Sequence, residues 1–208
     1  SIMSNDLQKL FKKFMEEYES ELNAARKDKD FKRPLGNIVR KDIAHLIGAQ
    51  LPENIYKVKG SVGAGSWADI PWIGVFDKRV TTSAQRGVYI VYLLNKTTKE
   101  LFLTLNQGVT DVVTTSNSKA ADNLKNRAQS IRSKIGSFPS LESSLIGSGS
   151  KAYDAGCIYY IKYTLDSLPE DEKLYSDLNK FIEAYKAYYD KFFLKSEEND
   201  VQVQEGEE

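Results

Sequence analysis

Residues 87–108 read Gly87-Val88-Tyr89-Ile90-Val91-Tyr92-Leu93-Leu94-Asn95-Lys96-Thr97-Thr98-Lys99-Glu100-Leu101-Phe102-Leu103-Thr104-Leu105-Asn106-Gln107-Gly108. Two apolar and aromatic runs, about 88–94 and 101–105, flank a short polar segment. Runs of this length and composition are typical of buried strands, and the segment between them is short enough for a hairpin loop. The stretch therefore predicts an antiparallel sheet.

Further strands are predicted on both sides of this hairpin. Residues 56–59 alternate lysine with tyrosine and valine, which predicts a strand with one solvated face. The glycines of 60–65 are expected to interrupt that strand. A second strand should begin near Ile70, and the last should cover 155–165.

Helical periodicity appears at both ends of the chain and once between the strands. The predicted helices cover 5–25, 34–46, 118–135 and 169–195. Ser4 or Asn5 can cap the first helix, and Pro169 suits the first turn of the last. We therefore expect an α+β fold in which helices pack around a curved, mainly antiparallel sheet, as a single domain over 3–195.

Composition limits the class of protein. With 208 residues, 41% of them apolar, the chain can bury one sizeable core. Cys157 is its one cysteine, which excludes an internal disulfide, and no signal-peptide pattern precedes the first helix. A reducing, cytoplasmic environment is the expectation.

The net charge of zero hides an uneven distribution. Residues 196–208 contain six acids and no base, so residues 1–195 contain 29 bases and 23 acids, a net charge of +6. An acidic segment of this composition is expected to be a disordered tail or linker. A second interpretation is that it mimics DNA and covers a basic face.

Residues for catalysis are sparse. The glycines of 60–65 lack the Gly-Lys-Ser/Thr of a phosphate-binding loop. His45 and Cys157 are the only histidine and cysteine, so neither a zinc cluster nor a Cys-His pair is supported. The acids of 170–172 follow Pro169, where they favour a helix start. The sequence predicts a binding domain, not an enzyme, and no cofactor or metal.

Aromatic residues beside flexible backbone indicate a surface that holds a flat ring. The candidates are Trp67, Trp72, Tyr89, Tyr92 and Tyr153. Stacking on such side chains is worth about 1 to 3 kcal/mol per base, enough to offset much of the cost of extruding a base from a duplex. The competing interpretation is that these aromatic residues belong to the core.

The pattern over 56–108 resembles the N-terminal DNA-binding domain of McrB-like, modification-dependent (type IV) restriction enzymes. The residues that match are the glycine loop, Ile70-Pro71-Trp72, the run 87–93 and Leu103-Thr104-Leu105-Asn106-Gln107-Gly108. The resemblance implies a domain that binds duplex DNA and flips out a methylated cytosine such as 5-methylcytosine. It also implies an AAA+ GTPase motor domain and a nuclease subunit as partners.

The resemblance places Trp72, Leu93 and Tyr153 in the pocket for the flipped base. It makes the glycine loop the part that enters the groove, namely Gly63, Ala64, Gly65, Ser66 and Trp67. Here the chain departs from the family pattern, because Ala64 stands where a relative has an aromatic residue. Either Trp67 takes over the wedge role or the duplex is handled differently.

Basic residues that flank this region in sequence are the candidates for DNA backbone contacts, namely Lys57, Lys59, Lys78, Arg79 and Arg86. Two alternatives remain open at this stage: a nucleic-acid-binding module without base flipping, and an enzyme domain that binds a small ligand in the aromatic pocket. A protein-interaction module is a third.

Overall fold

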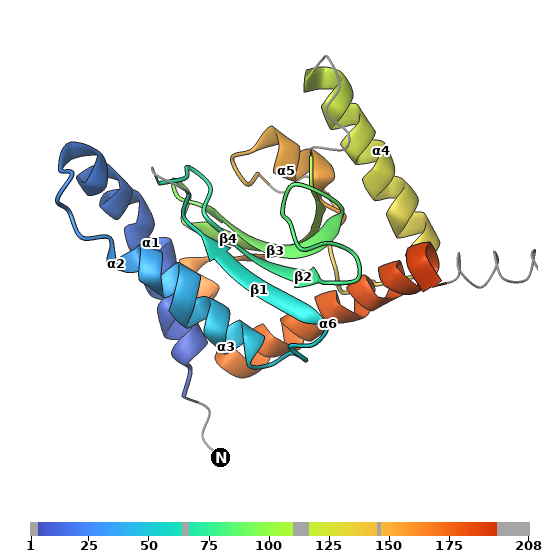
Figure 1. Ribbon diagram of the computed structural model, residues 1–208, viewed down its shortest axis with the longest axis horizontal. Helices are drawn as coiled ribbons and strands as arrows, with labels where there is room; N and C mark the ends of the chain where they lie inside the picture. The colour runs from blue at the N-terminus through green and yellow to red at the C-terminus, as the bar shows by residue number, and fades with distance from the viewer. Residues whose placement is uncertain (1–3, 64–66, 110–116, 145–146, 195–208) are drawn as a thin grey trace, which may run out of the picture.

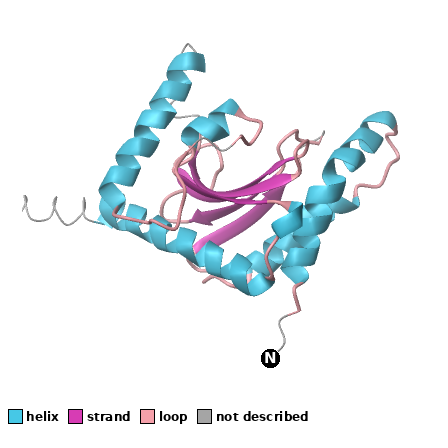
Figure 2. Ribbon diagram, turned by 180° about the vertical axis from the view of Figure 1, so that it is seen from behind, coloured by secondary structure: helices cyan, strands magenta, loops and turns pink. Residues whose placement is uncertain are grey.

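The computed structural model describes residues 4–63, 67–109, 117–144 and 147–194. Its centre is a five-stranded antiparallel sheet in the order β1-β2-β3-β4-β5, so each strand pairs with the strand that precedes it in the chain. The strands are β1 (Tyr56–Ser61), β2 (Trp72–Asp77), β3 (Val88–Asn95), β4 (Glu100–Gln107) and β5 (Tyr159–Tyr163). The sheet is curved and open (Figure 2), which confirms the predicted α+β class.

Helices lie on both sides of this sheet (Figure 1). One face is covered by α1 (Asp6–Lys27), α2 (Pro34–Asn37), the π-helical η1 (Ile38–Ile43), α3 (Ala44–Gly48) and α6 (Asp171–Tyr189). Over the other face lies α5 (Lys151–Gly156), with α4 (Asn117–Ile135) beside it. The short η2 (Leu165–Ser167) precedes α6, and η3 (Asp190–Leu194) continues it.

The main core lies between the sheet and the helices α1, η1 and α6. Side chains alternate between the two faces of a strand, so Tyr92 of β3 points to this side and its ring lies 5.4 Å from that of Phe11 in α1. The hydroxyl of Tyr185 in α6 donates to the carbonyl of Val88 and accepts from the backbone N–H of Asp77. The opposite face of the sheet therefore remains for α5 and the candidate site.

The sequence predicted that the glycines from Gly60 onward would interrupt the first strand. For Gly60 this prediction is wrong. Gly60 lies inside β1, which continues to Ser61. A Cβ at Gly60 would lie 2.1 Å from the carbonyl oxygen of Val39, so the strand passes directly against η1. Glycine is needed here for close approach of two backbones, not for a break.

The strand predicted over 155–165 is also shorter than expected. Ala155 and Gly156 end helix α5, and β5 begins at Tyr159. The helix forms because the Ser150 side chain accepts a hydrogen bond from the N–H of Tyr153 at 3.3 Å, which caps its first turn. A local cap thus overrides the apolar run that predicted extended backbone.

Three parts of the sequence-based prediction lie outside the described residues: Ala64, Gly65 and Ser66 of the glycine loop, Lys195 at the end of the last helix, and the acidic segment 196–208. Among the helices that are described, none combines the length and apolarity needed to cross a lipid bilayer.

Candidate functional site

Trp72 and Leu93 are direct cross-strand partners in the pairing of β2 with β3. Both side chains project from the face of the sheet opposite α1 and α6. Trp72 is half-buried, whereas Leu93 is fully buried. The structure therefore places two of the three predicted pocket residues side by side, with Trp72 as the accessible one.

A row of aromatic rings extends from Trp72 along this face. The ring of Phe76 lies 6.3 Å from that of Trp72, at 80°, and 5.2 Å from the ring of Tyr89. Gly74, between the first two on β2, makes the arrangement possible. A Cβ there would lie 2.6 and 2.7 Å from ring atoms of Phe76 and 3.2 Å from the indole of Trp72. The glycine lets both rings lie over the strand.

Tyr153 lies at the far end of this row, on α5. Its backbone carbonyl accepts a hydrogen bond of 3.1 Å from the buried side-chain amide of Asn106 in β4, which fixes α5 to the sheet. Burial raises the pKa of Tyr153, and the pKa of Tyr89 is raised by burial and, in addition, by the neighbouring Tyr153. Tyr153 thus connects to Trp72 through Tyr89 and Phe76.

The side chain of Trp67, the last residue of the glycine loop, packs into the protein interior. Its ring stacks on that of Tyr18 in α1, with 5.1 Å between the centroids and an angle of 17°, and only 6% of the residue is exposed. The hydroxyl of Tyr18 donates to the carbonyl of Ala68. Trp67 is therefore held against α1, and a wedge role would require the Tyr18 stack to open.

The five predicted phosphate contacts fall into two groups. Lys57 and Lys59 lie on the edge strand β1, paired with Phe76 and Gly74, so they flank the aromatic row. Lys59 is exposed, and Lys57 is half-buried with its Nζ 3.3 Å from the carbonyl of Thr82.

The other three lie beyond the opposite end of the strands. Lys78 and Arg79 follow Asp77, which is five residues along the strand, or roughly 16 Å, from Trp72. Arg86 is exposed in the loop that leads into β3. The Nζ of Lys78 donates to the carbonyl of Glu53 at 2.7 Å, and Arg79 pairs with Asp77. Sequence proximity to Trp72 did not translate into spatial proximity for these residues.

Three cations that the sequence did not single out lie close to the Trp72 end. Arg26 and Lys96 both contact Asp69, which precedes β2 by three residues. The guanidinium of Arg33 lies 5.7 Å from the ring centroid of Trp67. These cations come from the end of α1, the loop before α2 and the turn after β3. They could not be recognised from the sequence because only the tertiary fold brings them together.

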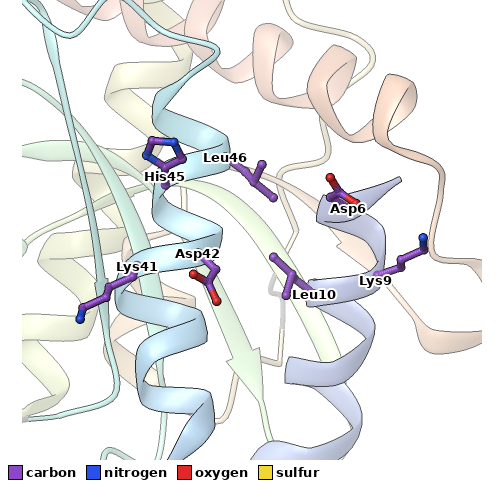
Figure 3. A pocket seen from close by; sticks show the side chains of 7 residues that line it. All are labelled: Asp6, Lys9, Leu10, Lys41, Asp42, His45 and Leu46. Carbon is purple, nitrogen blue, oxygen red and sulfur yellow. The ribbon is translucent and has the colours of Figure 1, made fainter. Parts of the chain in front are cut away.

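A separate cavity of about 730 Å³ lies between α1 and the η1–α3 segment (Figure 3). Leu10 and Leu46 point into it from the two helices, and its other lining residues are Asp6, Lys9, Lys41, Asp42 and His45. His45 is exposed here. This cavity belongs to the helical layer on the opposite side of the sheet from Trp72.

Within the described parts of the chain, no group of three or more His, Cys, Asp or Glu side chains is placed to hold a metal ion. Cys157 is buried, and burial raises the pKa of its thiol. A thiol in such surroundings is a poor nucleophile.

Comparison with known families is consistent with this geometry. A family model described as "MrcB-like, N-terminal domain" matches residues 13–190, which include all five strands, the whole of α6 and most of α1. Among curated proteins, none matches the chain significantly.

Proposed function

The chain belongs to the MrcB-like N-terminal domain family, and from that premise we propose that it recognises methylated cytosine in duplex DNA by flipping the base against Trp72. Membership of the family indicates that the chain is a non-catalytic, DNA-binding domain of a type IV restriction system. The methylated base, the flipping step and the residues of the pocket are the proposal.

The observation that best supports this function is the half-buried Trp72 at the end of an aromatic row. A flipped base costs a few kcal/mol to extrude, and stacking on an indole returns about 1 to 3 kcal/mol. Phe76 packs edge-on behind Trp72 and limits its rotation. A ring held in place loses little entropy on binding, so more of the stacking energy is available to the base.

The methyl group requires an apolar surface close to this stack. Leu93 is the cross-strand neighbour of Trp72 and lies on the same face of the sheet. Burying one methyl group is worth about 0.8 kcal/mol. Because Leu93 is fully buried, direct contact with a base requires the side chains that cover it to shift.

The proposed contacts with the DNA backbone lie at the same end of the sheet as Trp72. Lys59, Arg26, Arg33 and Lys96 supply positive charge around Trp72, where the phosphates of a bound duplex would lie. Tyr153 closes the far side of the pocket in this proposal. The GTPase motor and the nuclease would be contributed by another domain or subunit, in the cytoplasm.

The test is the substitution Trp72→Ala, measured by titration of a methylated and an unmethylated duplex at one salt concentration. We expect the preference for the methylated duplex to disappear, since about 1 to 3 kcal/mol of stacking is lost only for the flipped base. A fluorescent base analogue beside the target cytosine should brighten with the wild-type domain and remain quenched with the variant.

Phe138→Ala provides a matched control, because Phe138 is a half-buried aromatic residue that packs on Tyr159, away from Trp72. This variant should retain the preference. Equal weakening of both duplexes by Trp72→Ala would instead assign Trp72 to the core and favour nucleic-acid binding without base flipping.

A further inference from the structure

The carboxylate of Asp69 holds two cations from distant parts of the chain. Its Oδ1 lies 3.1 Å from Nη2 of Arg26 and 3.9 Å from Nζ of Lys96. Since both distances end at one oxygen atom, the two nitrogens are at most about 7 Å apart. Two positive charges so close would repel each other without an anion between them.

The position of this cluster is fixed by the fold. Arg26 is in the last turn of α1, and Lys96 follows β3 in the turn that leads to β4. The backbone next to Asp69 is held by the hydrogen bond from Tyr18 to the carbonyl of Ala68. Pro71 accepts a hydrogen bond from the N–H of Leu94 at 3.2 Å. The cluster therefore lies at the same end of the sheet as Trp72 and Leu93.

The contacts with Asp69 are of a kind that exchanges easily. The side chains of Asp69 and Arg26 are 72% and 56% exposed, and that of Lys96 is 23% exposed. Exposed ion pairs contribute little to stability, because solvent screens them and two flexible side chains must be held in place. A phosphate group offers more oxygen acceptors and can accept two parallel hydrogen bonds from a guanidinium.

We propose that Arg26 and Lys96 form a phosphate clasp for the DNA backbone beside the flipped base, and that Asp69 occupies this clasp in the free protein. The carboxylate keeps the two cations together before DNA arrives and competes with the phosphate when it does. This inference rests on the proposed DNA-binding function. It assigns Asp69 a negative effect on affinity that is independent of methylation.

The first experiment compares Asp69→Asn with Asp30→Asn. Both change the net charge by one unit, and Asp30 is an exposed acid in the loop after α1. Asp69→Asn should tighten binding of methylated and unmethylated duplexes by the same factor, about two- to tenfold, because the two cations no longer have a competing carboxylate. Asp30→Asn should have a clearly smaller effect. Equal effects of the two variants, or weaker binding by Asp69→Asn, would refute the clasp.

The second experiment removes the cations and varies the salt concentration. Arg26→Gln and Lys96→Gln should each lower the slope of log affinity against log salt by about 0.9, the value for one lost phosphate contact. Lys41→Gln is the control, because Lys41 is exposed on η1 on the opposite side of the sheet. An unchanged slope for both Arg26→Gln and Lys96→Gln would overturn the proposal.

The clasp and the base pocket can fail separately. If the wild-type domain binds methylated and unmethylated duplexes equally, base recognition is contradicted, but the response to Asp69→Asn would still show the clasp. A methyl preference with identical behaviour of Asp69→Asn and Asp30→Asn would contradict the clasp alone. No binding of either duplex by the wild-type domain would overturn both.

Discussion

Arg79 has a structural role in the fold, although arginine is a residue type that often binds DNA phosphates. Its Nε and Nη2 donate to the carboxylate of Asp77 at 3.0 and 2.8 Å, and its guanidinium carbon lies 3.7 Å from the ring centroid of Tyr189. The hydrogen bond to Asp77 is the main cause that raises the pKa of Arg79. Asp77 is 1% exposed, so these donors compensate a buried negative charge.

We predict that Arg79→Ala and Lys59→Ala have opposite signatures. Arg79→Ala should lower the free energy of unfolding by about 1 to 3 kcal/mol, because a buried carboxylate loses its charged donors. Its salt dependence of DNA binding should stay near the wild-type value. Lys59→Ala should leave stability unchanged and lower the salt slope by about 0.9. Urea unfolding and DNA titrations measure the two effects, and a stable Arg79→Ala variant with a reduced slope would contradict this assignment.

At the residue scale, local pattern explains what the sequence could predict about the site. The family motif around Trp72 and the hairpin that contains Leu93 are both local, and the two residues proved to be paired neighbours. The contact of Arg26 with Asp69 joins residues 43 apart, and the stack of Tyr18 on Trp67 joins α1 to a loop. No periodicity encodes such contacts, because they depend on where the helices dock.

At the scale of elements, the first and last long helices cap each other. The carboxylate of Asp171, at the start of α6, accepts from the backbone N–H groups of Leu7 and Gln8 at 3.0 and 2.7 Å. In return, Oδ1 of Asn5 accepts from the N–H of Asp171 at 3.0 Å. The sequence predicted that Asn5 caps α1 and that Asp171 favours its own helix. Each side chain instead serves the other helix.

Asp171→Ala should therefore destabilise α1 as well as α6. Two N–H groups in the first turn of α1 lose their acceptor, which is expected to lower the free energy of unfolding by about 1 to 2 kcal/mol. Glu172→Ala is the matched control, because Glu172 is the exposed acid next in sequence and should have an effect near zero. Thermal unfolding of both variants, with hydrogen exchange at Leu7 and Gln8, measures the difference. Similar stability of the two variants would exclude reciprocal capping as a significant contribution.

The elements themselves were largely predictable, and the exceptions have local causes. Alternation in 56–59 and the two apolar runs of 87–108 correspond to β1, β3 and β4. The helix α5 was missed because it is only six residues long and its Ser150 cap precedes an apolar run. The π-helical η1 was not foreseen either, although its close approach to Gly60 explains why glycine stands at that position in β1.

At the scale of the whole molecule, tyrosines are a large part of the core. Burial raises the pKa of the phenol groups of Tyr18, Tyr56, Tyr89, Tyr92, Tyr163 and Tyr185 above the ordinary value of 10.0. For Tyr56 the value is about 12. The folded protein thus holds these protons more tightly than the unfolded chain does.

The domain should consequently lose stability at alkaline pH. A group with a raised folded-state pKa contributes its full stabilisation below its unfolded pKa and loses it as the pH rises through the folded value. For Tyr56 this window runs from pH 10.0 to about 12. Urea midpoints measured across it should fall steadily, and phenolate absorbance should rise in the same transition as unfolding. Early phenolate formation in a domain that stays folded would contradict the burial of these groups.

The hydrogen bonds between Asp171 and the start of α1 also affect how the chain folds during its synthesis on the ribosome. Strands β1 to β4 can pair in order as they emerge, because each needs only the strand before it. The first turn of α1 must wait for a residue 164 positions later, and at about 5 to 20 residues per second the delay is roughly ten to thirty seconds. Throughout this interval the core that contains Phe11 and Phe14 lacks the side chains of α6, so part of its apolar surface stays open to chaperones until the last helix is synthesised.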